Sequence, residues 1–185
     1  LQEAEGLSGD GSAAFKTADG LSFNLALQAS APDLGALIAS QQDHASLLDF
    51  TALGGKSIQL ELTQRREASY DHQLGFYEVA DHDGRVVRTD AVSPDDADYT
   101  SQALAHRVNV LDNLSVADGE TKLTSITVEG GQLLAPYAVV RAAQDITYFA
   151  FPSASPDQKT HFRSFGQNVI GLEDLFGLGD NDFDD

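Results

Sequence analysis

The nine residues KSIQLELTQ at positions 56–64 decide the fold class, because their side chains alternate in polarity with a period of two. Ile58, Leu60 and Leu62 lie on one side of an extended chain, and polar residues lie on the other. A β-strand in a sheet with one buried and one wet face has this pattern. The stretch therefore predicts a β-strand, and the alternation at 21–27 predicts another.

Outward from this stretch, turn residues divide the chain into short apolar runs. Further strands are expected at 74–79, 85–87, 108–111, 114–116, 123–128, 132–140, 146–151 and 161–165. Asp83-Gly84 predicts a hairpin turn, and Gly130-Gly131 predicts a second turn. A short helical segment is predicted after Asp98. We therefore expect an all-β fold, an antiparallel β-sandwich or jelly roll with little helix.

Length and composition limit the number of domains that the chain can form. The 185 residues, of which 42% are hydrophobic, are enough for one domain with a sizeable core. Residues 1–20 are small, polar and glycine-rich, which predicts a connector or a loose first strand. A single β-sandwich domain is expected over 21–185. The chain begins at Leu1 and contains no Met, which indicates a piece of a longer polypeptide.

Charge and cysteine content exclude several classes of function. The formal net charge is -18 at pH 7, whereas nucleic acids and anionic membranes attract basic surfaces. No apolar run approaches the length of a membrane-spanning helix, and the N-terminal residues do not resemble a signal peptide. Cysteine is absent, which excludes disulfides, a thiol nucleophile and a thiolate zinc site. Neither nucleic acid nor membrane insertion is therefore expected.

The run GLEDLFGLGDNDFDD at 171–185 carries six carboxylates and no basic residue. The alternation of Asp180, Asp182 and Asp184 lets a tightly turning backbone aim several oxygens at one point, as calcium loops do. A solvated acidic tail is the alternative interpretation, because blocks of like charge are usually disordered. Large apolar residues between the acids, among them Phe183, favour a metal loop.

We therefore predict a Ca²⁺ site in this acidic loop. The predicted side-chain ligands are Glu173, Asp180, Asp182 and Asp184, with Asp174 and Asp185 as alternates or as groups that support the ligands. A divalent cation offsets the repulsion among these carboxylates. Oxygen ligands on a flexible, glycine-rich loop favour calcium over zinc, which prefers nitrogen and sulfur, and over magnesium, which demands a stricter octahedron.

The acidic loop also resembles the closing signature of the domain-of-unknown-function family 4114. The matching stretches are IGLEDL at 170–175 and GDNDFDD at 179–185, and the family motif has E-D, a glycine-containing spacer and D-x-D-F-N-D before a hydrophobic strand. LGFYEV at 74–79, the Asp83-Gly84 turn and GQLLAPYAV at 131–139 resemble earlier elements of the family. Asp184 stands where the family more often has Asn, and the chain stops where the last strand of the family begins.

The resemblance covers about 56–185 and implies a β-sandwich from a large secreted, calcium-associated bacterial protein. It also implies a hydrophobic strand after Asp185. We therefore expect that the natural last strand is missing and that an unpaired sheet edge at the C-terminal end can pair with another chain.

The sequence lacks the motifs of several common classes of enzyme. It has no G-x-S-x-G elbow, no H-E-x-x-H pair and no phosphate-binding loop, and none of the five histidines is at ligand spacing to another. His161 is interpreted as a hydrogen-bonded edge residue rather than a catalytic base. The pairs Asp95-Asp96 and Asp184-Asp185 do not define the separation that a glycosidase needs. We therefore expect a non-catalytic module.

Two functions remain open for a secreted, extracellular calcium-binding module. In the first, the ion shapes loops that recognise carbohydrate or another cell-surface ligand, as in an adhesin. In the second, calcium only fastens the last loop, and the domain spaces or caps its neighbours. Exposed aromatic residues near the metal favour recognition, and Tyr70, Tyr99 and Tyr137 are the candidates.

Overall fold

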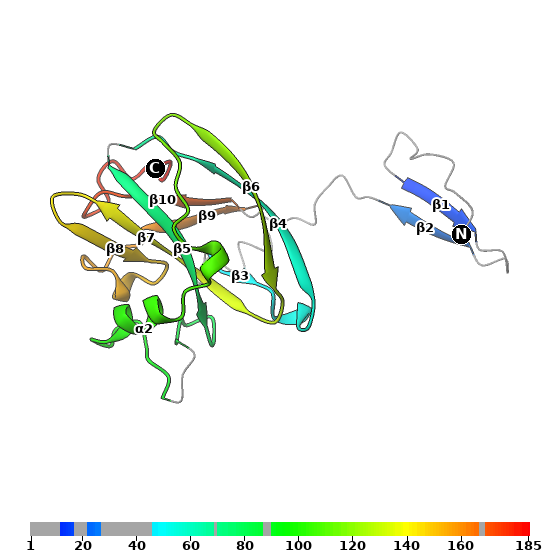
Figure 1. Ribbon diagram of the computed structural model, residues 1–185, viewed down its shortest axis with the longest axis horizontal. Helices are drawn as coiled ribbons and strands as arrows, with labels where there is room; N and C mark the ends of the chain where they lie inside the picture. Colours follow the sequence, from blue (N-terminus) through cyan, green and yellow to red (C-terminus); the bar gives the residue numbers. More distant parts are fainter. Residues whose placement is uncertain (1–11, 17–21, 27–45, 69, 87–89, 167–168) are drawn as a thin grey trace. The chain divides into compact units, whose positions relative to one another are not determined.

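The structure, a computed structural model, describes residues 12–16, 22–26, 46–68, 70–86, 90–166 and 169–185 (Figure 1). It divides into two compact units, Leu1–Ser40 and Gln41–Asp185. In the first unit, β1 (Ser12–Lys16) pairs antiparallel with β2 (Ser22–Ala26), so the strand expected at 21–27 is confirmed. The second unit contains the other described strands.

The second unit is organised around β7 (Leu133–Arg141), which lies between other strands (Figure 1). The antiparallel strand β5 (Asp71–Val79) follows one edge of β7 over nine residue pairs. The other edge is shared by β3 (Leu48–Asp49) and β8 (Asp145–Phe149). Because both faces of β7 are covered, its sequence LLAPYAVV is apolar throughout instead of alternating.

Two separate pairs of antiparallel strands pack on one face of this central sheet. In the first, β4 (Ser57–Arg65) pairs with β6 (Thr121–Glu129), and in the second, β9 (Phe162–Gly166) pairs with β10 (Val169–Leu172). The inward residues of β4 are those of the alternating pattern, and they pack against Phe76 and Leu134. Phe162 and Leu172 pack further along the same face. The second pair thus brings the C-terminal strand beside the core.

The opposite face of the central sheet is covered by α2 (Tyr99–Ala105) and by the segment that carries Val86 and Val92. Tyr77, Tyr99 and Phe149 form edge-to-face ring contacts there. The Tyr77 and Tyr99 hydroxyls are 2.9 Å apart, and the Tyr99 hydroxyl donates to the Gly84 carbonyl at 2.7 Å. Tyr99 is therefore part of the core, not a surface aromatic residue.

We expect Tyr99→Phe to lower the free energy of unfolding by about 1–3 kcal/mol, because it leaves two buried polar partners unsatisfied. Tyr70→Phe is the control, since Tyr70 is 38% exposed. Chemical denaturation of the two variants measures the difference. Equal free energies of unfolding for the two variants would contradict a stabilising role of the Tyr99 hydroxyl.

The expected all-β class is confirmed: in the described residues, strands predominate and form antiparallel sheets with one α-helix. The short helix after Asp98 is confirmed as α2. The remaining helical turns are the 3₁₀ segments Thr51–Leu53, Asn109–Leu111 and Pro152–Ala154. None of the described helices is long and apolar enough to span a membrane.

Two strand predictions are wrong or reduced. Residues 108–111 do not form a strand but contain the 3₁₀ turn Asn109–Leu111, whose Leu111 is buried under the β4–β6 strand pair. Residues 114–116 provide a single bridge between Leu114 and Leu74. In the predicted hairpin the turn forms, with a Gly84 N–H bond to the Asp81 carbonyl at 3.1 Å, and Val86 bridges Val79 and Val92, whereas Val87 lies outside the described residues.

Candidate metal centre

Glu173 directly follows β10, and its backbone is held on both sides by His161. The Glu173 N–H donates to the His161 carbonyl at 2.9 Å, and His161 Nδ1 donates to the Glu173 carbonyl at 2.6 Å. Both residues have 0% exposure. The last strand therefore delivers the Glu173 side chain to a fixed, buried position.

Three of the predicted ligands converge at this position. One carboxylate oxygen from each of Glu173, Asp182 and Asp185 lies within 4.8 Å of one from each of the others. Glu173 Oε1 accepts a hydrogen bond from the Leu175 N–H at 3.2 Å. Glu173 Oε2 is buried and has no hydrogen-bond partner among the described residues. A buried carboxylate oxygen without a partner is costly, and it marks the place where a cation would be stabilised.

Asp185 closes the acidic loop back onto its beginning. Its Oδ2 accepts a hydrogen bond from the Asp174 N–H at 2.8 Å, across eleven residues of chain. Asp182 is exposed, and its Oδ1 accepts a long hydrogen bond of 3.5 Å from the Asp184 N–H. The cluster therefore has one buried, one half-buried and one exposed member, so that it opens to solvent on the side of Asp182.

The other three predicted ligands lie outside the cluster in this structure. Asp174 is buried, and its Oδ2 lies 3.8 Å from His72 Nδ1, which is too long for a direct hydrogen bond. Asp180 and Asp184 are exposed on the loop. Asp180 still acts on the cluster through its charge, which is one of the causes that raise the pKa of Glu173.

The path of the loop is set by residues in the left-handed region of backbone space. These include Gly177 and, less commonly for their side chains, Leu178, Asn181 and Phe183, with φ values of 68°, 61° and 63°. Phe183 is 2% exposed, and the Arg163 guanidinium lies 3.8 Å from its ring centroid. The Phe183 side chain therefore anchors a turn that a solvated tail would not have.

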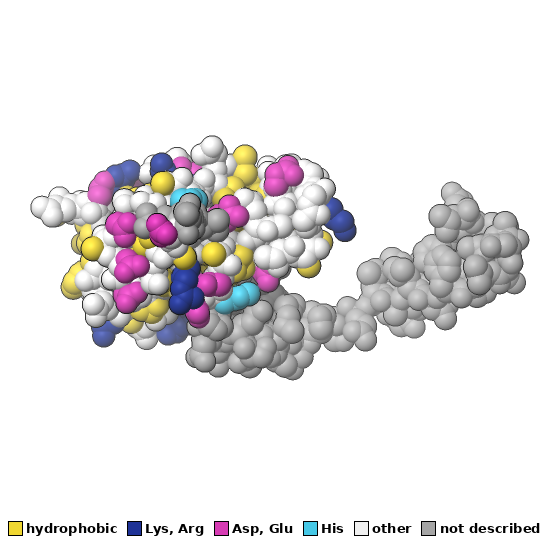
Figure 2. Space-filling view, turned by 90° about the horizontal axis from the view of Figure 1, so that it is seen from below, with side chains coloured by type: hydrophobic (Ala, Val, Ile, Leu, Met, Phe, Trp, Pro, Cys, Tyr) yellow, Lys and Arg dark blue, Asp and Glu magenta, His cyan; other side chains and the backbone are white. Residues whose placement is uncertain are grey.

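Burial and mutual repulsion raise the pKa values of the clustered carboxylates. For Asp185, burial and the charges of Asp174, Glu173 and Asp182 raise the pKa to about 6, against the hydrogen bond from the Asp174 N–H. The pKa of Glu173 is also raised, first by burial and then by Asp180 and Asp182. Burial and like charge thus both disfavour the ionised cluster. Figure 2 shows another face of the molecule, on which acidic and basic side chains lie side by side.

The oxygens of this cluster are of the kind that calcium prefers as ligands. Calcium takes oxygen ligands at about 2.3–2.6 Å, so two ligands of one ion can be at most about 5 Å apart. The three oxygens lie within 4.8 Å of one another, so one ion could contact all of them. Three carboxylates leave room for carbonyl or water oxygens, because calcium takes about six to eight ligands. Cysteine is absent, so a thiolate zinc site is excluded.

The raised pKa of Asp185 predicts a pH dependence in the presence of a chelator. Its pKa is about 6 in the folded protein and about 3.9 in an unfolded chain, so the folded state binds the proton more tightly. The ionised Asp185 carboxylate destabilises the folded protein fully above pH 6, and protonation relieves this effect as the pH falls towards 4. Between these two pH values we expect the wild type to gain about 1 kcal/mol in the free energy of unfolding relative to Asp185→Asn, or roughly 2–4 °C in melting temperature. The gain is small because partial exposure screens the charge. Parallel melting curves for the two proteins across this pH range would contradict the shift.

A buried hydrogen-bonded pair lies beside the centre. His161 Nε2 lies 3.0 Å from both carboxylate oxygens of Asp157, and the His161 ring stacks on Tyr148 with centroids 3.6 Å apart. Both ring nitrogens therefore face acceptors, Nδ1 the Glu173 carbonyl and Nε2 the Asp157 carboxylate. Asp157 also accepts from the Gly177 N–H at 2.7 Å. Burial tends to raise the pKa of Asp157, but these hydrogen bonds outweigh it and lower the pKa.

His161 therefore has the hydrogen-bonded role expected from the sequence, although it is fully buried rather than at a surface edge. Sequence reasoning missed Asp157, which joins His161 to the acidic loop. The only signal for this pair was the spacing of four residues between an acid and a histidine. The contact of His72 with Asp174 had no signal, because the two residues are a hundred positions apart.

Comparison of the chain with known protein families, with curated proteins and with solved structures finds no match.

Proposed function

We propose that this domain is a non-catalytic calcium-binding module of a secreted bacterial protein, and that it recognises a carbohydrate or another cell-surface ligand. The observation that carries the proposal is the convergence of carboxylate oxygens of Glu173, Asp182 and Asp185, together with the buried Glu173 Oε2, which has no hydrogen-bond partner among the described residues. A calcium ion supplies the missing partner and offsets the repulsion among the three carboxylates. The resemblance of 170–185 to family 4114 agrees with an adhesin-like, secreted setting.

An exposed aromatic residue beside the cluster supports recognition. Phe176 is 64% exposed and lies three positions after Glu173, within the acidic loop. Carbohydrate and protein surfaces both pack well against exposed aromatic rings. Of the tyrosines considered from the sequence, Tyr99 and Tyr137 are buried in the core, and only Tyr70 is exposed. Phe176 is thus the best-placed contact residue.

A structural role is the second candidate, and the closure of the loop favours it. The hydrogen bond from the Asp174 N–H to Asp185 joins the two ends of the loop, and the cluster lies at this junction. Calcium bound there would fasten the last residues to the end of β10. In that case the ion stabilises the module and its surface needs no ligand.

A binding screen separates the two candidates. The wild-type protein is applied to a glycan array and to bacterial and animal cell surfaces, with calcium and with a chelator. We expect calcium-dependent binding that Phe176→Ser lowers at least fivefold. Val110→Ser is the matched control, because Val110 is 51% exposed and lies outside the acidic loop. If calcium stabilises the protein but no surface binds it, the structural candidate replaces recognition.

A further inference from the structure

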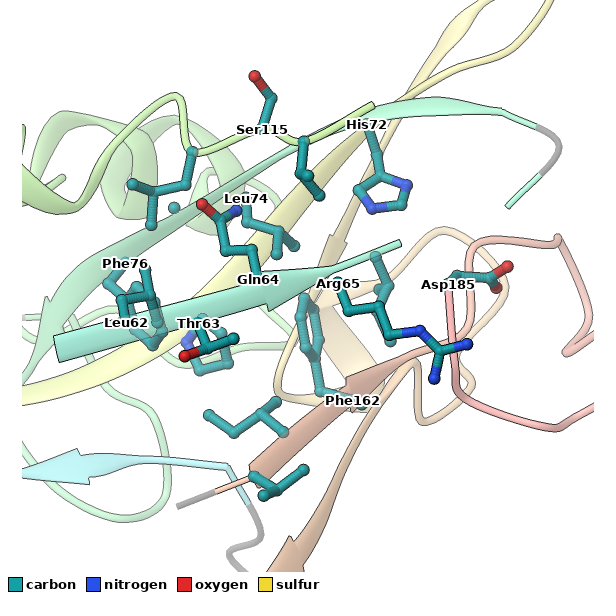
Figure 3. Close-up of a pocket in the computed structure, with 18 of the residues that line it drawn as sticks. Leu62, Thr63, Gln64, Arg65, His72, Leu74, Phe76, Ser115, Phe162 and Asp185 are labelled. Carbon is teal, nitrogen blue, oxygen red and sulfur yellow. The ribbon is translucent and has the colours of Figure 1, made fainter. Parts of the chain in front are cut away.

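A cavity of about 440 Å³ lies between the β4–β6 and β9–β10 strand pairs that pack on the central sheet (Figure 3). Its walls include five consecutive residues of β4, at 61–65, and all four residues of β10. Side chains alternate between the two faces of a strand, so consecutive residues can line one cavity only where it runs along the edge of the strand. The cavity is therefore a slot between the edges of β4 and β10.

The edge of β4 that faces the slot carries unpaired backbone groups. Among the described strands, β4 pairs only with β6. The Gly130 N–H bonds to the Lys56 carbonyl and the Arg66 N–H to the Glu120 carbonyl, so the even-numbered residues of β4 bond to β6 along the continuous register. The N–H and C=O groups of residues 61, 63 and 65 therefore point to the opposite edge, into the slot.

The edge of β10 is organised in the same way. Among the described strands, β10 pairs only with β9, and the Glu173 N–H bonds to the His161 carbonyl at the end of that ladder. Gly171 belongs to the same set of bonded pairs in the register. The backbone groups of Ile170 and Leu172 therefore point away from β9. Two rows of unpaired backbone donors and acceptors line one slot.

The floor of the slot is apolar, with a few buried polar atoms. Leu74 and Phe76 of the central sheet and Phe162 of β9 line it. Gln64 Oε1 and His72 Nδ1 also belong to lining residues, are buried and have no hydrogen-bond partner among the described residues. Figure 3 shows Gln64, His72 and Leu74 around the cavity. The slot thus offers apolar contacts below and backbone hydrogen bonds on two sides.

We propose that the slot binds an extended strand of a partner polypeptide, inserted between β4 and β10. A peptide backbone is the chemistry that satisfies both rows of donors and acceptors, whereas a small apolar ligand leaves them unpaired. Residues 61–65 span about 17 Å, so the inserted segment is about five residues long. Its alternate side chains are apolar and face Leu74 and Phe76. The net charge of -18 favours a neutral or basic strand.

The slot rests on other observations than the calcium site, although Asp185 belongs to the acidic cluster and also lines one part of the slot. It specifies the strand pairing that the sequence predicts at the C-terminal edge. The inserted strand would join the β4–β6 and β9–β10 strand pairs into one continuous layer over the central sheet. The partner gains affinity from main-chain hydrogen bonds and specificity from its inward side chains.

Selection from a displayed peptide library tests the proposal. The library holds nine-residue peptides with random apolar residues at alternate positions and random polar, non-acidic residues between them. It is panned against the immobilised 185-residue chain, with calcium and with a chelator in parallel. The best peptide is then synthesised with a fluorescent label, and its dissociation constant is measured by fluorescence anisotropy. We expect enrichment of alternating peptides and loss of binding when alternate backbone nitrogens of the peptide are methylated.

Thr63→Pro provides the matching change in the protein. Proline removes an N–H that faces the slot and spares the bonds to β6, so we expect binding at least fivefold weaker with little change in melting temperature. Thr63→Val keeps the N–H and should bind within twofold of the wild type. N-methylation of the peptide leaves the protein intact, so the test holds even if Thr63→Pro folds poorly.

Two results would contradict binding of a strand in the slot. The first is that no alternating peptide is enriched, with calcium or with chelator. The second is that the dissociation constant is unchanged both by N-methylation of the peptide and by Thr63→Pro in the protein. A wild-type dimer in light scattering that Thr63→Pro dissociates would show instead that a second copy fills the slot, and would overturn a separate partner. Calcium-dependent melting is measured on the same protein, so failure of the calcium site and failure of the slot are told apart.

Discussion

Calcium at about a hundredfold over its dissociation constant is expected to raise the free energy of unfolding by about 2.7 kcal/mol. For a chain of this size the gain corresponds to roughly 5–11 °C in melting temperature. The gain arises because the folded protein holds three carboxylates together at Glu173, Asp182 and Asp185, and an unfolded chain does not. Thermal melting with calcium and with a chelator measures it. Identical melting temperatures in the two conditions would return the acidic run to a tail without a metal.

Matched substitutions show which carboxylates hold the ion. Glu173→Gln and Asp182→Asn should remove most of the calcium-dependent gain, because each deletes one charged ligand of the cluster. Their melting temperatures in chelator should equal or exceed that of the wild type, since repulsion is relieved. Asp180→Asn is the control, because it removes the same charge from a residue outside the cluster. If Asp180→Asn loses as much of the gain as Asp182→Asn, the geometry of the loop is different from the one described.

The alternation of polar and apolar residues was sufficient to predict the strands that have one buried face. The stretch at 56–64 forms β4 at Ser57–Arg65, and its three apolar residues face the core as the alternation requires. The apolar run at 132–140 forms β7, whose neighbours on both faces could not be inferred from the run itself. Strand periodicity reports burial of side chains, but it does not report which strands are adjacent.

Short apolar runs were less informative. Residues 108–111 read VNVL, which alternates like a strand, but Leu111 reaches the core from a 3₁₀ turn closed by its N–H bond to the Val108 carbonyl. Four residues can place an apolar side chain in the core in either conformation. The strand β10 was missed for the opposite reason, because the glycine within VIGL and the acids after it indicated a loop.

The sequence indicated the acidic loop, and the structure brings three of its six carboxylates together. The alternation of Asp180, Asp182 and Asp184 predicted that a tightly turning backbone aims their oxygens at one point. The left-handed conformations of Asn181 and Phe183 break this period, so only Asp182 of the three joins Glu173 and Asp185. Positive φ values at residues other than glycine depend on tertiary contacts, here the burial of Phe183, and a sequence pattern does not contain them.

Loss of the buried contact between His161 and Asp157 is expected to lower the free energy of unfolding more than the loss of a surface charge does. His161→Ala leaves the Asp157 carboxylate, whose side chain is 4% exposed, without the His161 ring as a hydrogen-bond partner. Leaving a buried polar group without its partner typically costs about 1–3 kcal/mol, and more where the group is charged. It also deletes the stacking on Tyr148 and the hydrogen bond to the Glu173 carbonyl. Chemical denaturation should therefore show a large decrease in the free energy of unfolding.

The exposed pair of Arg85 and Asp81 is the matched control. It has a comparable spacing of four residues and a distance of 3.0 Å, but both side chains are more than a third exposed. Arg85→Ala should lower the free energy of unfolding much less than His161→Ala does, because water screens the exposed pair. Since His161 fixes the backbone of Glu173, His161→Ala should also weaken calcium binding, and Arg85→Ala should leave it unchanged. Equal losses of stability in the two variants would mean that the buried contacts of His161 do not stabilise the fold, and that the acidic loop is positioned by Phe183 and Asp185 instead.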